Sequence, residues 1–275
     1  MTWTIEELAG VRAVALDVDG TIAGGDHQVS ERTRRAIQSL AAEGVPAVLL
    51  TGRSRANTLS LAREIGITNQ VASCNGAVVF DPVTDENTRV VGMAPAEIEA
   101  IASLHDDLNL DLTWWTADEI LVDHDGAMRR QLIALNESEV LVEDFADQNP
   151  DSIVKMMLHG SPEALDAATD EILARAPRGT RSMDVFFEFV DTNATKWSAL
   201  QYILAPLGIE PGDVMGIGDG GNDVVFLSNI GHAIAMGNAR QEVVDAARHQ
   251  IGHHAHDGAA EIIELAQRLI VAGRA

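Results

Sequence analysis

The chain has 275 residues, 46% of them hydrophobic, so it can bury a sizeable core in one large domain or two smaller ones, and disorder is excluded as its main state. Acidic residues outnumber basic ones by 42 to 19, and a formal charge of −23 argues against nucleic acid and anionic membranes as partners. With one cysteine, no secretory signal in residues 1–10 and no apolar run near the roughly 18 residues that span a bilayer, we expect a cytoplasmic protein.

The first third of the chain predicts alternating strands and helices. Residues 11–16 form a short apolar run that indicates a buried strand. A helix follows, with Ser30 as its N-cap and Gly44 where it would stop. Residues 45–50 predict a second buried strand, and the next helix is expected to end at Gly66. Such alternation predicts an α/β fold, a parallel sheet with helices on both faces.

The pattern changes after residue 76. Residues 78–80 and 89–91 flank a polar turn and predict a hairpin. The stretch that follows mixes helices with strands that have one exposed face, with strands expected at 111–116, 119–123, 153–158 and 185–190 and helices at 96–108, 126–136 and 162–176. This predicts a second α+β domain inserted into the first. We place the discontinuous core at residues 1–82 and 191–275 and the inserted domain at 83–190.

The alternating pattern returns near residue 195. A helix to about residue 207 precedes an apolar strand at 213–217, which leads directly into the segment GDGGND at 218–223. A short strand at 233–235 and an amphipathic helix over 262–270 complete the chain. The returning pattern supports a core built from both ends of the sequence.

Carboxylates follow two of the apolar strands at their carboxyl ends. Asp17 and Asp19 come after the first strand, and Asp219 and Asp223 come after the strand that ends at residue 217. Open α/β sheets bind ligands in the crevice at this edge. If the two strands are neighbours, four carboxylates converge, which is unfavourable without a cation. Magnesium prefers oxygen ligands, so we expect Mg²⁺ at this edge.

The two acidic loops also resemble two other motifs, and they could have a purely structural role. Asp17 could open a calcium loop, but its twelfth position is Gln28 rather than Glu and a strand precedes it. Residues 216–221 match Gly-x-Gly-x-x-Gly, yet Asp219 inside that turn would repel a dinucleotide pyrophosphate. Asp and Gly are also common turn formers. Two acidic loops after apolar strands, with Thr51-Gly52 after a third, favour a functional site.

The motifs resemble those of the haloacid dehalogenase superfamily of phosphotransferases, and most closely its Cof-like branch, in which a large α/β cap is inserted between the second and third motifs. The resemblance spans nearly the whole chain. The matching segments, in family order, are DVDGT at 17–21, LLTGR at 49–53, Lys196 and GDGGND at 218–223, with NGA at 75–77 and AMGNA at 235–239 as further signatures. Trp197 departs from the small residue that usually follows the lysine.

The resemblance implies a magnesium-dependent phosphatase in which Asp17 is the nucleophile and forms an aspartyl-phosphate. Asp19 would be the general acid for the leaving alkoxide and then the base for water, and Lys196 would neutralise phosphoryl charge. Mg²⁺ would be held by Asp17, the backbone carbonyl of Asp19 and Asp219, with Asp223 supporting the metal. Phosphate or substrate contacts are implied for Thr51, Gly52, Arg53 and Asn222; for Arg53 a surface salt bridge is the alternative.

Several questions stay open at the level of sequence. Small phosphorylated metabolites, sugar phosphates first among them, are the expected substrates, and the alternatives are a phosphosugar mutase using the same intermediate or a non-catalytic regulatory binding protein. Trp114 and Trp115 should point to opposite faces of a cap strand, one into the core and the other toward a sugar, a base or the domain interface. The histidines at 249, 253, 254 and 256 could bind zinc, lie in a loop near the site or simply be exposed to solvent. The oligomeric state is not predicted.

Overall fold

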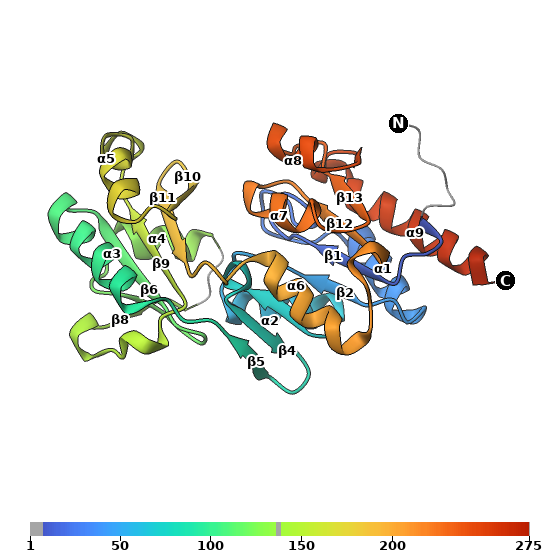
Figure 1. The fold of residues 1–275 in the computed structure, drawn as a ribbon, viewed down its shortest axis with the longest axis horizontal. Coiled ribbons are helices and arrows are strands. Elements are labelled where there is room, and N and C mark those ends of the chain that lie inside the picture. Colours follow the sequence, from blue (N-terminus) through green and yellow to red (C-terminus); the bar gives the residue numbers. More distant parts are fainter. Residues whose placement is uncertain (1–7, 136–138, 275) are drawn as a thin grey trace.

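The computed structural model describes residues 8–135 and 139–274, which form two α/β bodies between which the chain passes twice (Figure 1). The first body is built on a five-stranded parallel sheet of order β14-β13-β12-β1-β2. Its strands are β1 (Ala13–Leu16), β2 (Ala47–Leu49), β12 (Val214–Gly218), β13 (His232–Ala235) and β14 (His249–Gln250). The parallel α/β fold expected from the sequence is confirmed.

Helices cover both faces of this sheet because the side chains of β1 alternate between two apolar clusters. Val14 and Leu16 pack in the cluster that holds α1 (Glu31–Ala42), α2 (Arg55–Ile65) and α9 (Gly258–Arg274). Ala13 and Ala15 pack on the other face, against α6 (Lys196–Leu204), α7 (Val224–Leu227) and α8 (Gln241–Ala246). Ser30 caps α1 and Gly66 ends α2 in the left-handed conformation, as predicted.

The strand order makes β1 and β12 neighbours, which is what a shared acidic site requires. β1 lies between β2 and β12, and Leu16 pairs with both Leu49 and Ile217. The loops that begin at Asp17 and Asp219 therefore leave the sheet at the same edge, side by side.

A small antiparallel sheet adjoins the edge of the first body. It consists of β3 (Val71–Ser73), β4 (Val78–Asp81) and β5 (Glu86–Val90), and a parallel bridge from Leu50 to Ala72 links it to the end of β2. The predicted hairpin is present, and the expected domain boundary at residue 83 falls inside it. The division into 1–82 with 191–275 and 83–190 remains a prediction.

The second body is built on a six-stranded mixed sheet of order β10-β11-β9-β6-β7-β8. Its elements are α3 (Pro95–Leu108), β6 (Asp111–Trp115), β7 (Ile120–Val122), α4 (Ala127–Ala134), β8 (Leu141–Val142), β9 (Lys155–His159), α5 (Pro162–Arg175), β10 (Thr180–Met183) and β11 (Phe186–Val190). Trp114 packs on the face covered by α3 and α5, where it stacks on Phe145. Trp115 belongs to the opposite face, so the two indoles do point apart, but both are buried.

The points where the chain enters and leaves the second body lie close together. The Arg89 guanidinium, at the end of β5, donates to the carbonyl of Asn193, 3.0 Å away, just before α6. Of the helices within residues 8–135 and 139–274, none combines the length and the apolar run that a membrane crossing requires.

Candidate active site

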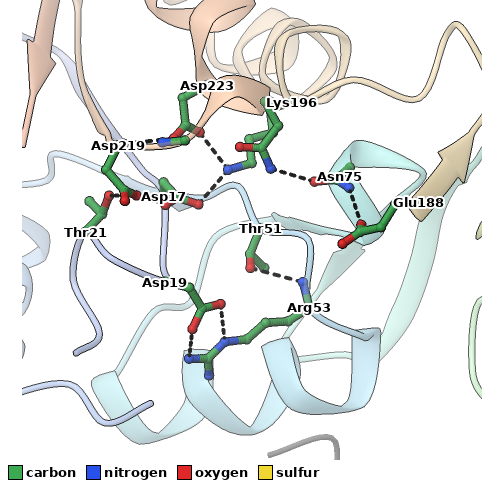
Figure 2. A network of polar contacts seen from close by, with 12 residues as sticks. Asp17, Asp19, Thr21, Thr51, Arg53, Asn75, Glu188, Lys196, Asp219 and Asp223 are labelled. Atoms are coloured by element: carbon green, nitrogen blue, oxygen red, sulfur yellow. Dashed lines mark hydrogen bonds and ion pairs between the residues drawn. The ribbon is translucent and has the colours of Figure 1, made fainter. Parts of the chain in front are cut away.

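A pocket of about 540 Å³ opens between the two bodies at the carboxyl edge of the parallel sheet. Its lining from the first body includes eight of the nine residues predicted for the site, namely Asp17, Asp19, Thr51, Gly52, Arg53, Lys196, Asp219 and Asn222. The ninth, Asp223, is fully buried beneath the pocket. The fold thus brings together residues that lie up to 206 positions apart, and Figure 2 shows ten of the site's side chains labelled.

Three carboxylates converge at the floor of the pocket. Oxygens of Asp17, Asp219 and Asp223 lie within 4.8 Å of one another, which no other set of three potential ligand residues achieves in the described part of the chain. Burial, together with the neighbouring Asp223, raises the pKa of Asp17 well above its usual value and raises that of Asp219 too. Ionised together, these carboxylates would repel one another. A hard divalent cation bound between them would offset that repulsion, so the cluster fits such an ion.

Two glycines allow the acidic loops to approach so closely. Gly20 has φ +79°, and a Cβ there would lie 2.3 Å from an Asp219 oxygen. A Cβ on Gly218 would lie 2.6 Å from the Asp223 carboxylate. Any side chain at either position would push the carboxylates apart.

Lys196 is the first residue of α6 and points into the acidic cluster. Its helix begins with a capping box, in which the Thr195 hydroxyl accepts from the Ser198 amide and the Ser198 hydroxyl accepts from the Thr195 amide. The ammonium donates to Asp17 at 2.5 Å and to Asp223 at 2.6 Å (Figure 2). Burial lowers the pKa of Lys196, but the two carboxylates more than offset this and raise it above its usual value. The lysine is therefore buried and cationic.

Trp197, the departure from the family pattern, does not disturb this arrangement. Its side chain packs on the apolar cluster formed by α6, α7 and α8, on the side of the helix away from the pocket. Asp223 receives further hydrogen bonds from the amides of Asp219 and Gly220, at 3.0 and 2.9 Å. Asp223 therefore fixes the shape of the acidic loop, in keeping with a supporting role.

Asp19 is held apart from the other carboxylates by Arg53. The guanidinium donates to both Asp19 oxygens, at 2.9 and 2.7 Å, and also to the Asn57 side chain at 2.9 Å. Burial alone would raise the pKa of Asp19, but the hydrogen bonds and charge of Arg53 bring it below its usual value. Arg53 is only 6% exposed, whereas the Asp19 side chain with which it pairs is 47% exposed, so the salt bridge considered as the alternative is present, but its arginine is buried rather than at the surface. In this conformation the pair fixes the Asp19 carboxylate in the lining of the pocket.

The second body contributes an ion pair that sequence reasoning missed. Lys155 of β9 is buried and contacts the Glu188 carboxylate at 2.7 Å, the Gly52 carbonyl at 3.2 Å and the ring of Trp115 at 4.2 Å. A lone lysine in the apolar strand KMMLH was the available signal, because a buried charge requires a partner.

The ion pair is connected to the acidic loop through Asn75. The Asn75 amide donates to Glu188 at 3.2 Å, and its carbonyl oxygen accepts from the Asn222 amide at 2.9 Å (Figure 2). Asn75 has φ +56°, a left-handed conformation that asparagine tolerates well. A hydrogen-bonded chain therefore runs from the second body to the loop that contains Asp219.

Replacement of Glu188 by glutamine should make the free energy of unfolding depend less on pH in the acid range. Burial raises the pKa of Glu188, but Lys155 outweighs it and lowers the pKa below the ordinary 4.5. The pair's contribution is therefore present above pH 4.5 and lost as the pH falls through the lowered folded-state value. At pH 7 we expect Glu188→Gln to lose about 3–5 kcal/mol, because Lys155 stays buried without its counter-charge.

Urea unfolding between pH 7 and pH 3 measures this effect. The difference between wild type and Glu188→Gln should shrink toward the acid end, whereas Glu99→Gln, exposed on α3, should match wild type throughout. A difference that stays constant with pH would show that Glu188 is not ionised by its pairing with Lys155.

The C-terminal histidines do not gather into a cluster of three metal ligands in the described part of the chain. The rings of His253 and His254 lie 4.4 Å apart, but no three ligand atoms of these residues converge within the part of the chain that is described. The His254 amide donates to Asn238, whose amide in turn donates to Asp219 at 3.1 Å. The segment thus lies beside the acidic cluster, which is one of the alternatives left open by the sequence.

Comparisons with known proteins show similarity to one family of hydrolases along most of the chain. The sequence profile of haloacid dehalogenase-like hydrolases matches residues 14–263. A Bacillus subtilis protein provisionally named phosphatase YxeH is 27% identical over 261 residues, covering 92% of this chain and 97% of the relative. A haloacid dehalogenase-like hydrolase from Bacteroides thetaiotaomicron superposes with a TM-score of 0.83 at 23% identity, covering 92% and 98%. The subclass IIB sugar phosphatase BT4131 superposes with a TM-score of 0.81 at 23% identity, with the same coverage.

Proposed function

The chain belongs to the haloacid dehalogenase-like hydrolases and is a phosphatase, and from that premise we propose a magnesium-dependent phosphomonoesterase that uses Asp17 as its nucleophile. The observation that supports this most is the placement of the Lys196 ammonium between Asp17 and Asp223, with Asp219 beside them at the floor of the pocket. The substrates are small phosphorylated molecules. Sugar phosphates are the group suggested by the sequence and by the name of one structural neighbour.

In the first step an Asp17 oxygen attacks phosphorus, and the bond between phosphorus and the leaving alkoxide breaks. Asp19 gives the alkoxide its proton, for which it must be protonated and released from the contact with Arg53 that this conformation has. Thr51, at the carboxyl end of β2, and Asn222, in the acidic loop, are placed at the pocket to bind phosphoryl oxygens. Lys196 stays protonated beside Asp17 and offsets the negative charge that accumulates there.

Magnesium would be held by the carboxylates of Asp17 and Asp219 and the backbone carbonyl of Asp19, with Asp223 supporting the loop. Its positive charge would make the acidic pocket able to accept a phosphate dianion despite the net charge of −23. In the second step Asp19 removes a proton from water, the water attacks phosphorus, and Asp17 is released together with inorganic phosphate.

Arg53→Lys should lower kcat about tenfold or more while changing KM only a few-fold. Lysine keeps the positive charge but loses the planar fork that fixes the ionised Asp19 carboxylate, so the base that takes the proton from water in the second step is less often aligned. Steady-state kinetics on one phosphate ester measure both constants. The opposite result, a raised KM at unchanged kcat, would instead assign Arg53 to substrate binding.

Two alternatives predict other behaviour. A phosphosugar mutase would return the phosphoryl group to a sugar hydroxyl and would depend on a bisphosphate activator. A non-catalytic binding protein would not need Asp17, Asp19, Asp219 and a buried Lys196 in one pocket, so the arrangement favours an enzyme.

Phosphate release from a panel of sugar phosphates, nucleotides, coenzyme phosphates and an aryl phosphate tests the proposal. Each should be assayed with Mg²⁺, with a chelator and with Asp17→Asn. Release that needs both the metal and Asp17 supports a phosphatase of this mechanism. Activity that survives the chelator, or transfer to a second hydroxyl without phosphate release, would overturn it.

A further inference from the structure

The part of the pocket beyond the phosphate end has a largely apolar wall. The second body supplies most of it, and the first body adds one helix residue. The apolar side chains of this wall include Trp115, Leu135, Met157, Met183, Phe186 and Val225. A pocket of about 540 Å³ is in the range of small-molecule sites, so it has room for a leaving group well beyond the phosphate.

Two of these side chains are exposed to solvent. Met183, at the end of β10 in the second body, is 44% exposed, and Val225, on α7 of the first body, is 49% exposed. Both line the same pocket, one from each body. Exposed apolar side chains that meet at one cleft indicate a surface that an apolar ligand covers.

The charged groups of the same wall are already engaged. Lys155 is paired with Glu188 and also contacts the Gly52 carbonyl. At the rim, Arg178 is paired with Glu97 and Arg181 with Asp166. A polyhydroxylated leaving group would have to compete with these ion pairs and would be left with polar groups such as Thr180, Ser182 and Arg240, whereas an apolar ring needs no hydrogen-bond partner.

We propose that the preferred substrates are phosphate monoesters of primary alcohols whose leaving group carries an aromatic ring. The inference rests on the proposed function and narrows it away from free sugar phosphates. The ring would lie between Met183 and Val225, with Phe186 and Met157 behind it. Methionine sulfur and aromatic side chains make favourable contacts with a flat ring, which decides for an aromatic group over an aliphatic chain. Hydrolysis breaks the bond between phosphorus and the alkoxide, consumes one water and gives the alcohol and phosphate.

A matched set of esters tests the proposal without a bias from leaving-group reactivity. 2-Phenylethyl phosphate, ethyl phosphate and glucose 6-phosphate all release a primary alkoxide. With wild type and Mg²⁺ we expect kcat/KM for 2-phenylethyl phosphate to exceed that for ethyl phosphate by about tenfold or more, and to exceed that for glucose 6-phosphate too. A preference for glucose 6-phosphate would overturn the inference and leave the proposed function intact.

Two variants locate the preference. Met183→Gln and Val225→Thr keep side-chain size but add polarity, so each should reduce the ratio of phenylethyl to ethyl phosphate while leaving ethyl phosphate turnover unchanged. Leu173→Gln, exposed on α5 outside the pocket lining, should leave the ratio as in wild type. A ratio that survives both pocket substitutions would contradict the assignment.

Binding separates this inference from the proposed chemistry. 2-Phenylethylphosphonate and ethylphosphonate cannot be hydrolysed. Calorimetry with each of them in the presence of Mg²⁺ therefore measures affinity for the pocket without any reaction. Tighter binding of the aromatic phosphonate supports the inference even if no ester is hydrolysed, a result that would overturn only the proposed function. Equal affinities would overturn the inference whatever the activity.

Discussion

Replacement of Asp17 by asparagine is expected to reduce phosphate release by about 10³-fold or more. The amide is nearly the same size as the carboxylate and can still accept a hydrogen bond from Lys196, so the pocket should keep its shape. It cannot, however, form the bond to phosphorus, because a carboxamide oxygen is a much weaker nucleophile than a carboxylate. The loss should therefore fall on kcat at every substrate concentration.

The same substitution should not lower stability when metal is absent. Burial and the neighbouring carboxylates raise the pKa of Asp17 in the fold, so its charged form is less favourable there than in the unfolded chain, and a neutral isostere removes that cost. Thermal unfolding in chelator should give a midpoint for Asp17→Asn at or above that of wild type.

A matched control is available on the surface. Asp106→Asn changes the same functional group on a highly exposed side chain of α3 and should alter neither turnover nor the unfolding midpoint. Turnover by Asp17→Asn within tenfold of wild type, with the control normal, would remove Asp17 from the role of nucleophile.

Replacement of Asp219 by asparagine is the second change for which we expect a large effect. The Asp219 carboxylate accepts from the Thr21 hydroxyl at 3.2 Å and from the Asn238 amide at 3.1 Å, and an asparagine can keep part of this network. What it removes is negative charge from the proposed metal site. The Mg²⁺ concentration for half-maximal activity should rise by more than the roughly 10–100-fold that loss of a supporting partner costs.

A magnesium titration of activity, paired with direct Mg²⁺ calorimetry, checks this. Asp223→Asn provides the contrast, because Asp223 accepts hydrogen bonds from Lys196 and from two backbone amides of its own loop. That variant should lose stability as well as activity, whereas Asp219→Asn should unfold at the wild-type temperature in chelator. An unchanged magnesium titration for Asp219→Asn would exclude this carboxylate as a ligand.

The parallel sheet and the acidic cluster were predictable because local signals and topology agreed. A buried parallel strand reads as a short apolar run, and a polar residue at its carboxyl end marks the ligand edge. Only adjacency of β1 and β12 was missing from the sequence, and the pairing of Leu16 with Ile217 supplied it. The elements β3, β8, β10 and β14 were not predicted; β8 and β14 consist of two residues each, too few to show any periodicity.

The ion pairs at the pocket could not be predicted from the sequence. Arg53 appeared as a residue after a strand, and its pairing with Asp19 depends on how two loops 34 residues apart are placed. Lys155 and Glu188 lie on different strands of the second sheet, and each alone resembles an ordinary charged residue. Partners for buried charges are chosen by tertiary structure, which periodicity does not encode.

The hydrogen bond between Arg89 and the Asn193 carbonyl has an evolutionary consequence. It joins the two connecting segments, so everything between them is linked covalently to the sheet at one narrow junction. A segment joined this way can lengthen, shorten or be exchanged while the strands that place Asp17 and Asp219 keep their register. Mutations confined to one contiguous stretch of the gene can therefore change which substrate is recognised during evolution. The residues that carry out the chemistry lie outside that stretch and can stay the same.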